Sequence, residues 1–189
     1  MLKEIVNETT NAVVAAVKGT NDIMNAVTST VKNQIVNIFK ETGEVGSAGI
    51  EAVSSVASGA IHGVGQVGAS LTDAAQQVVH GVVVGVSQAG GDVIKATREA
   101  AHGVIRATSE TGGDIAAVAV STVEGAIKTA GGVGADTSEA AKAAVGGALD
   151  AAGDVGGNAT QKVRDALLAS ATLPRDVIES AIKGHEEKR

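Results

Sequence analysis

Hydrophobic and polar residues recur along this chain with a period of eleven. The period is clearest from Gly81 to Glu124, where four blocks of eleven residues follow one another without a gap. The first block resembles the third and the second resembles the fourth, which adds a longer period of 22 residues. The same frame extends from Glu4 to Glu179. Because eleven residues make three helical turns of about 3.67 residues, the period predicts amphipathic helices.

The apolar residues of each block fall on one side of such a helix. If the eleven places are numbered from the first residue of a block, places two, three, six, nine and ten hold mostly Val, Ile, Ala, Thr or Gly. On a helical wheel these places form one arc of roughly 130–160°. Places four, seven and eight carry most of the charge, and some blocks put a base four residues before an acid, as in Lys95 with Glu99 and Arg106 with Glu110. Residues at this spacing are neighbours on a helix, so the sequence predicts an all-α protein.

Glycines recur at the end of every second block, singly or in pairs. Glycine permits close packing inside a helix and also ends helices, so these positions are predicted to be either packing sites or turns. The packing or turn glycines are Gly68, Gly90, Gly91, Gly112, Gly113, Gly134, Gly156 and Gly157.

Each glycine site is followed by a residue type that commonly caps the start of a helix. Two helical architectures fit this order. In the favoured one, long amphipathic helices run through the glycines and pack side by side, straight or in a right-handed, coiled-coil-like manner. In the alternative, the chain turns every 22 residues and stacks helical hairpins as a solenoid. A β-solenoid is a third and less favoured option, because the charge pairs and Ala-rich blocks favour helices. The cap residues are Ser70, Asp92, Asp114, Asp136 and Asn158.

The repeat divides the chain into a long region and a short tail. Residues 1–169 keep the eleven-residue frame and form the predicted helical repeat region. Within it, the stretch from Glu4 to Thr42 contains a single glycine, Gly19, and is predicted to be a long helix. Residues 170–189 are predicted to form a short C-terminal helix, restarting near Pro174, and a polar tail.

The composition limits both the core and the partners. Among 189 residues there are one Phe, no Trp, no Tyr, no Cys and 25 Gly. The chain is therefore predicted to be stabilised by many small contacts, by neighbouring chains or by lipid. The net charge of −6 argues against DNA or RNA as a partner, because binding phosphates needs a basic surface. The lack of cysteine excludes a disulfide framework.

The N-terminus and the middle of the chain bear on its location. Glu4 and Glu8 interrupt any apolar run of a signal peptide. A cytoplasmic or peripheral membrane location is therefore expected. Between Glu51 and Asp92 the only formal charge is Asp73, so a pore-forming helical assembly of this segment is considered as a weaker option.

Candidate catalytic and metal-binding motifs are weak. Gly63 to Gly68 match G-x-G-x-x-G, but a dinucleotide site needs a preceding strand that the repeat does not predict. His62, His80 and His102 share the polar face, but on a continuous helix they are too far apart to bind one ion. No G-x-S-x-G nucleophile motif occurs. The sequence therefore predicts no enzyme, no cofactor and no metal site.

The eleven-residue pattern resembles that of synucleins, perilipins and late-embryogenesis-abundant proteins. The segment Lys95-Ala-Thr-Arg-Glu-Ala-Ala-His-Gly-Val104 looks like a synuclein repeat, whose core is Lys-Thr-Lys-Glu-Gly-Val. The resemblance covers nearly the whole chain and rests on the repeat pattern. It implies reversible binding to lipid surfaces and disorder in free solution, although the chain lacks the Lys-rich flanks and aromatic anchors of those proteins.

These observations favour a non-enzymatic structural protein that assembles with itself. A face covering five of eleven places is wider than a two-stranded coiled coil needs, so it requires partners on two sides or a lipid surface. The favoured hypothesis is a homo-oligomeric bundle, tube or filament, and the alternative is a peripheral coat on a membrane or lipid body. The predicted assembly or lipid-facing surface comprises Val82, Val83, Val86, Val93, Ile94, Val104, Ile105, Ile115 and Val123.

Overall fold

The computed structural model describes residues 1–18, 22–41 and 47–188. In these ranges the chain forms helices and no strand, so the prediction of an all-α protein is confirmed and the β-solenoid option is wrong for them. The helices are α1 (Leu2–Lys18), α2 (Ile23–Glu41), α3 (Ser47–Gln66), α4 (Leu71–Gln88), α5 (Val93–Glu110), α6 (Ile115–Gly132), α7 (Thr137–Val155), α8 (Ala159–Ala169) and α9 (Arg175–Glu186).

The helices are shorter than the favoured architecture predicts. α1 ends at Lys18 and α2 begins at Ile23, so the long helix expected from Glu4 to Thr42 is wrong; Gly19 and Thr42 themselves lie outside the described residues. From α3 to α8 the chain turns every 22 residues, which is the arrangement of the alternative prediction. The repeat region is therefore a series of helices rather than one continuous helical segment.

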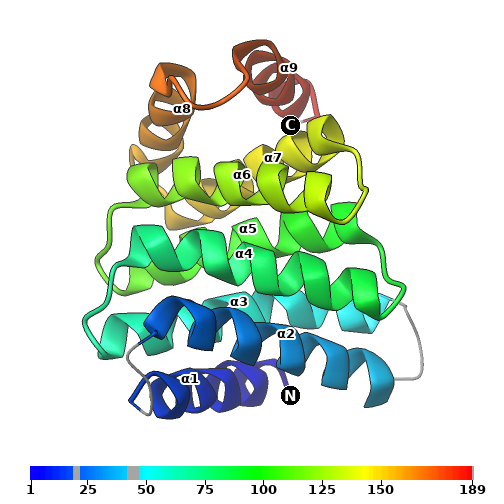
Figure 1. Cartoon of the computed structure of the whole chain (residues 1–189). Coiled ribbons are helices and arrows are strands. Elements are labelled where there is room, and N and C mark those ends of the chain that lie inside the picture. The colour runs from blue at the N-terminus through cyan, green and yellow to red at the C-terminus, as the bar shows by residue number, and fades with distance from the viewer. Residues whose placement is uncertain (19–21, 42–46, 189) are drawn as a thin grey trace.

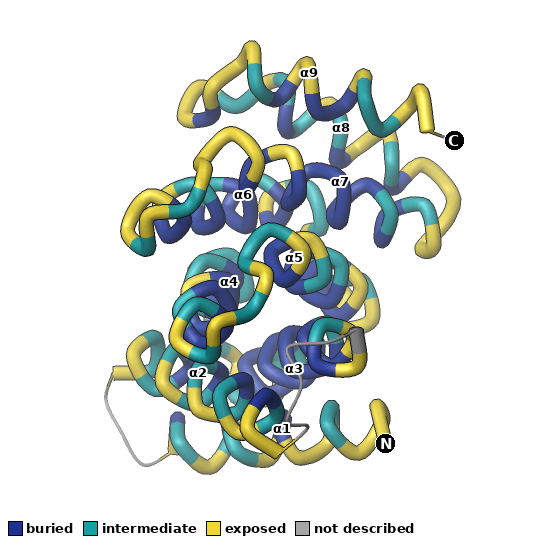
Figure 2. Tube along the Cα trace, turned by 90° about the vertical axis from the view of Figure 1, so that its right-hand side faces the viewer, coloured by how far each residue is buried: buried dark blue, intermediate teal, exposed yellow. Residues whose placement is uncertain are grey.

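The helices are stacked in two columns (Figures 1 and 2). One column holds α1, α3, α5, α7 and α9, and the other holds α2, α4, α6 and α8, because each helix packs most extensively on a helix two places away in the chain. From α1 to α7, successive helices run in opposite directions, so neighbouring helices of one column run roughly parallel there. The stack also twists along its length: Figure 2 shows α4 and α5 nearly end-on, whereas α9 crosses the view.

Each turn from α3 to α8 contains a glycine in the left-handed conformation, which other residues disfavour. At Gly90 the φ angle is 75°, and the N–H of Gly91 donates to the carbonyl of Val86 at 2.9 Å, which closes the C-terminus of α4 in a Schellman arrangement. Gly91 and Gly113, each directly after a left-handed glycine, have no room for a side chain. An added Cβ would be 2.7 Å from Val86 at Gly91 and 2.6 Å from Leu71 at Gly113. The left-handed conformation recurs at Gly68, Gly112, Gly134, Gly156 and Gly157.

Four of the five predicted helix caps form. The Asp92 carboxylate accepts a hydrogen bond, at 3.0 Å, from the backbone N–H three residues later at the start of α5. Ser70, Asp114 and Asp136 make equivalent bonds at the starts of α4, α6 and α7. Asn158 makes no side-chain cap bond, although α8 begins directly after it. A cap of this kind contributes about 1 kcal/mol, so most helix starts are set locally.

Of the predicted charge pairs, Arg106 with Glu110 forms as expected and Lys95 with Glu99 does not. The Nε of Arg106 lies 3.0 Å from a carboxylate oxygen of Glu110. The amine of Lys95 instead lies 3.5 Å from Asp92, the cap residue at the start of its own helix. Because pairs of exposed charges stabilise a helix only slightly, their rearrangement leaves the helix itself unchanged.

A second series of glycines, also 22 residues apart, brings neighbouring helices of a column into close contact. A Cβ on Gly147 in α7 would lie 2.1 Å from the carbonyl oxygen of Arg98 in α5. A Cβ on Gly103 in α5 would lie 2.3 Å from the carbonyl oxygen of Ser54 in α3. A larger side chain could occupy these places only by moving a helix. The series, called the crossing glycines below, comprises Gly59, Gly81, Gly103, Gly125 and Gly147.

The core between the helices consists almost entirely of Val, Ala and Ile. Val82, Val104 and Ile105 have no exposed surface, and Phe39 is also buried. Small side chains fill this core because the crossing glycines let neighbouring helices approach closely. The apolar face that the repeat predicts is thus buried inside one chain.

Candidate functional site

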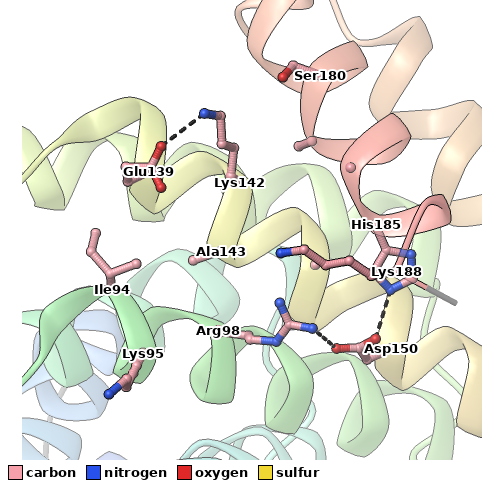
Figure 3. Close-up of a pocket in the computed structure, with 13 residues that line it drawn as sticks. Ile94, Lys95, Arg98, Glu139, Lys142, Ala143, Asp150, Ser180, His185 and Lys188 are labelled. Carbon is pink, nitrogen blue, oxygen red and sulfur yellow. Dashed lines mark hydrogen bonds and ion pairs between the residues drawn. The ribbon is translucent and has the colours of Figure 1, made fainter.

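A cleft opens between α5, α7 and α9 at the C-terminal end of the stack (Figure 3). Its volume is about 390 Å³. α5 and α7 are parallel neighbours in one column and form two of its walls, and the short helix α9 forms the third. The charged groups on the walls are four bases, Lys95, Arg98, Lys142 and Lys188, and two acids, Glu139 and Asp150.

The cleft has the opposite charge balance to the chain as a whole. The chain contains 21 acidic and 15 basic side chains, yet the bases of the cleft outnumber its acids by two to one. Like charges gathered around a partly enclosed space raise the local concentration of counter-ions. The cleft is therefore a cationic site within an acidic protein.

Asp150 joins the three walls of the cleft. Its Oδ2 accepts a hydrogen bond from Arg98 Nη2 at 2.5 Å, and its Oδ1 accepts one from His185 Nε2 at 2.7 Å. Burial acts to raise the pKa of Asp150, but the hydrogen bond from His185 and the charge and hydrogen bond of Arg98 together outweigh it and lower that pKa. Asp150 is therefore ionised at neutral pH and ties α5 and α9 to α7.

Gly146 provides the space in which the Arg98 side chain lies. A Cβ on Gly146 would be 2.8 Å from Arg98 Nη1, so the guanidinium rests directly against α7. Asp150 fixes its other edge. A guanidinium held in this way loses little freedom when it binds an anion.

The lysines of the cleft differ in how they are held. The amine of Lys142 lies 2.9 Å from Glu139, and the hydrogen bond and charge of this carboxylate raise the pKa of Lys142. Lys188 has no ion-pair partner among the residues that the structure describes. In Figure 3 its side chain reaches over the cleft from the end of α9 toward the side on which Arg98 lies. Lys188 is thus the base of the cleft that is most readily available to a ligand.

A smaller hollow of about 280 Å³ lies at the other end of the same column, between α1, α3 and α5. It is called the N-terminal hollow below. Six of its lining residues precede a residue of the cleft by 88 positions, which is four times the repeat of 22. The equivalent pairs are Val6 and Ile94, Asn7 and Lys95, Ser54 and Lys142, Ser55 and Ala143, Ser58 and Gly146, and His62 and Asp150.

The predicted assembly or lipid-facing surface lies inside the folded chain. Val82, Val83, Val86, Val104, Ile105 and Val123 have no exposed surface. Val93, Ile94 and Ile115 are partly buried, and Ile94 also lines the cleft. In this fold the fully buried residues face other helices of the same chain, which supply the neighbours that the wide apolar face requires.

The histidines connect neighbouring helices within a column. His62 Nε2 lies 3.0 Å from a carboxylate oxygen of Glu110, and His102 Nε2 lies 3.0 Å from one of Asp154, which links α3 to α5 and α5 to α7. His80 is hydrogen-bonded to a threonine hydroxyl of α6 at 3.2 Å. Within residues 1–18, 22–41 and 47–188, no three His, Cys, Asp or Glu side chains are grouped so that they could hold a metal ion.

A hydroxyl, an imidazole and a carboxylate line up across α3, α5 and α7. Ser54 Oγ is 3.5 Å from His102 Nδ1, and His102 Nε2 is 3.0 Å from Asp154 Oδ2. Ser54 lies in the middle of α3, where backbone N–H groups are used by the helix, so none is free to stabilise an oxyanion beside its hydroxyl. We therefore interpret this row as a bridge between helices.

Two further motifs from the sequence fall on helices and turns. Gly63 to Gly68 occupy the end of α3 and the turn after it, and no strand precedes them in the described part of the chain, so the context of a dinucleotide site is lacking. The segment from Glu51 to Asp92 corresponds to most of α3 and to α4. Among the described helices, none has both the length and the apolar content that crossing a membrane requires.

The residues of the cleft were not predicted as a site from the sequence. The sequence did contain a signal for these residues, because they occupy the charged places of their blocks. Lys95 and Asp150 occupy place four, and Arg98 and Lys142 occupy place seven. These residues are far apart in the sequence. Only the turns between helices, which place α5 beside α7, bring them together.

Comparison with known proteins adds no family to this description. The resemblance to synucleins, perilipins and late-embryogenesis-abundant proteins remains a likeness of repeat pattern. No protein-family model matches the chain, and no curated protein is significantly similar to it.

Proposed function

We propose that this chain is a non-enzymatic binding protein whose helical stack holds the anionic group of a ligand in the cleft between α5, α7 and α9. The observation that carries the proposal is the gathering of four bases against two acids around a cavity of about 390 Å³, in a chain whose acids outnumber its bases. Small-molecule sites commonly occupy cavities of about this size or larger, with a few fixed polar groups.

The bases of the cleft have complementary roles in this proposal. Arg98 is held between Gly146 and Asp150 and offers a fixed guanidinium. Lys188 and Lys142 offer ammonium groups on flexible stems that adjust to the ligand. Each charge contributes about 1 kcal/mol at 4 Å in water-like surroundings. Three or four of them support binding of a small anion with a dissociation constant on the order of millimolar.

The stack supports this function by holding the walls in place. The crossing glycines and the buried Val and Ala residues fix α5 against α7, while places four and seven project toward the cleft. Side chains at these places can change without disturbing the core, as the equivalent residues of the N-terminal hollow illustrate. The fold thus separates the residues that build it from those that contact a ligand.

Self-assembly and lipid binding have less support from this fold. Both hypotheses relied on the Val/Ala/Gly face, which is buried between helices of one chain. Exposing that face to other chains or to lipid would require the stack to open.

Titration calorimetry with inorganic phosphate at low ionic strength tests the proposal. The substitution Lys142→Ser should weaken binding about threefold to tenfold, because it removes one charge beside the anion. Lys128→Ser is the matched control, since Lys128 lies on α6, in the other column, and does not line the cleft. Absence of phosphate binding, or equal weakening by both substitutions, would contradict the proposal.

A further inference from the structure

We infer that the cleft takes a small amphiphilic anion, with an anionic head beside Arg98 and Lys188 and a short hydrocarbon body along the apolar wall. This inference rests on the proposed function, because it names the ligand class of the same cleft. The inference is based on the uncharged residues that line the cleft.

Apolar and small residues cover the walls between the charged groups. Ile94 on α5, Ala143 on α7 and Ala181 on α9 line the cleft, and Gly184 adds no side chain. In Figure 3, Ile94 and Ala143 lie between the pair Glu139–Lys142 and the pair Arg98–Asp150. An inorganic anion would contact the charges and leave this apolar wall in water.

The stem of Arg98 extends the apolar wall. Lysine and arginine carry methylene stems that cover apolar surface while the charged end stays in water. Arg98 projects from α5 next to this wall, so its stem borders it, whereas in Figure 3 the side chains of Lys95 and Lys142 point away from Ala143. A hydrocarbon chain placed there gains up to about fourfold in affinity for each CH₂ group removed from water, which corresponds to roughly 0.8 kcal/mol.

The geometry separates the place of the head from the place of the chain. Arg98 and Lys188 meet on the side of the cleft where Asp150 holds the guanidinium. A carboxylate and a phosphate monoester share the anionic oxygens that these two groups bind. The volume of about 390 Å³ lies in the range of small-molecule sites, which suits a short hydrocarbon chain with its head.

A series of straight-chain carboxylates tests this inference in the full-length protein. Affinities of butyrate, hexanoate and octanoate should rise about twofold to fourfold for each added CH₂. Octanol, which has the chain but no charge, should bind at least about tenfold more weakly than octanoate. Octyl phosphate, measured beside octanoate, should also bind more tightly than octanol, and the ratio of the two anions identifies the preferred head.

Gly184→Leu is the variant that fills the cleft. A Cβ at this position in α9 meets no atom within 4 Å, so the variant is expected to fold. The leucine should occupy the apolar wall and remove the dependence of affinity on chain length. Leu2→Ser is the control, because the exposed Leu2 side chain lines the N-terminal hollow and offers hydrocarbon a different site.

The possible outcomes separate this inference from the proposed function. Equal affinities for butyrate and octanoate, with phosphate still bound, would overturn the amphiphilic ligand and leave the anion site intact. Loss of octanoate binding in Leu2→Ser but not in Gly184→Leu would also overturn it. Failure of wild-type protein to bind any of the anions would overturn the proposed function itself.

Discussion

The N-terminal hollow and the cleft occupy equivalent places in the repeat, 88 residues apart on one column of helices. Asn7 and Ser54 of the hollow correspond to Lys95 and Lys142 of the cleft. The hollow is lined by hydroxyl and amide groups, by the bridge between His62 and Glu110, and by two bases, Lys3 and Arg106. The cleft instead gathers four bases.

The difference shows which positions of the repeat set the fold and which set the surface chemistry. Near each site, a crossing glycine packs against a backbone carbonyl of the helix two places earlier in the chain. These glycines are Gly59 in α3, near the hollow, and Gly147 in α7, near the cleft. The equivalent positions on the surface differ in charge, size and hydrogen-bonding groups. A change at a crossing glycine should therefore damage the fold, whereas a change at places four or seven should alter binding alone.

The largest effect is expected when a side chain is placed at a crossing glycine. Gly147→Leu puts a Cβ 2.1 Å from the carbonyl oxygen of Arg98, so α5 and α7 must separate. We expect a loss of about 3 kcal/mol in the free energy of unfolding, measured by urea denaturation, together with loss of phosphate binding. Gly132→Leu is the control, because an added Cβ there meets no atom within 4 Å.

The equivalent change at the other end sharpens this prediction. Gly59→Leu puts a Cβ 2.6 Å from the carbonyl oxygen of Val6 and should destabilise the fold by a similar amount, about 2–3 kcal/mol. The damage should stay between α1 and α3, so phosphate binding should persist under native conditions. If Gly59→Leu abolished phosphate binding as Gly147→Leu does, the two ends would not behave as separate sites.

A smaller effect is expected when residues of the hollow are grafted into the cleft. Lys95→Asn combined with Lys142→Ser gives the cleft the residues that stand 88 positions earlier. Removing two charges should weaken phosphate binding about tenfold to thirtyfold at low salt. The free energy of unfolding should change by no more than ~0.5 kcal/mol. Unchanged affinity would show that these lysines do not face the anion.

Asp150 predicts a pH dependence of stability at the cleft, where the equivalent residue of the hollow is His62. The pKa of Asp150 is lowered in the folded protein, so its contribution to stability is present above the unfolded-state pKa and is lost as pH falls through the folded value. Hydrogen exchange should find α9 protected from neutral pH down to about pH 5, above the ordinary range of carboxyl groups. Asp150→Asn should expose α9 to exchange at neutral pH.

The smallest effect is expected at the basic residue nearest the N-terminus. Lys3 lines the N-terminal hollow but lies on α1, far along the column from α9. Lys3→Ser should therefore change phosphate affinity by less than about 1.5-fold, since exposed charges separated by more than ~10 Å are screened. Weakening equal to that of Lys142→Ser would indicate that phosphate binds to lysines without preference for the cleft.

Much of the fold could be predicted from the period of the sequence. The eleven-residue frame gave the all-α class, and the residues after each glycine gave the helix starts, as at Asp92 and Asp136. The period could not show whether the chain passes through Gly90 and Gly112 or turns there. Both arrangements bury the same apolar face, and the choice depends on contacts with helices 44 residues away.

The cleft could not be predicted for the same reason. Lys95 and Lys142 lie at charged places of their own blocks, where the pattern predicts only that each side chain is exposed to solvent. They become one site only when α7 stacks on α5 and α9 folds back over both. Likewise, Val82 and Ile105 were predicted to face other chains because their wide apolar face needs neighbours, and the sequence does not state that the neighbours belong to the same chain.

A titration of isotope-labelled protein with inorganic phosphate, followed residue by residue in nuclear magnetic resonance spectra, tests the central claim most directly. The account predicts that backbone amide signals shift around Arg98, Lys142, Gly146 and His185 with one common dissociation constant. Signals around the N-terminal hollow, such as those of Ser54 and Ser58, should stay in place. Equal shifts at both ends of the column, or shifts scattered over all exposed lysines, would contradict the account.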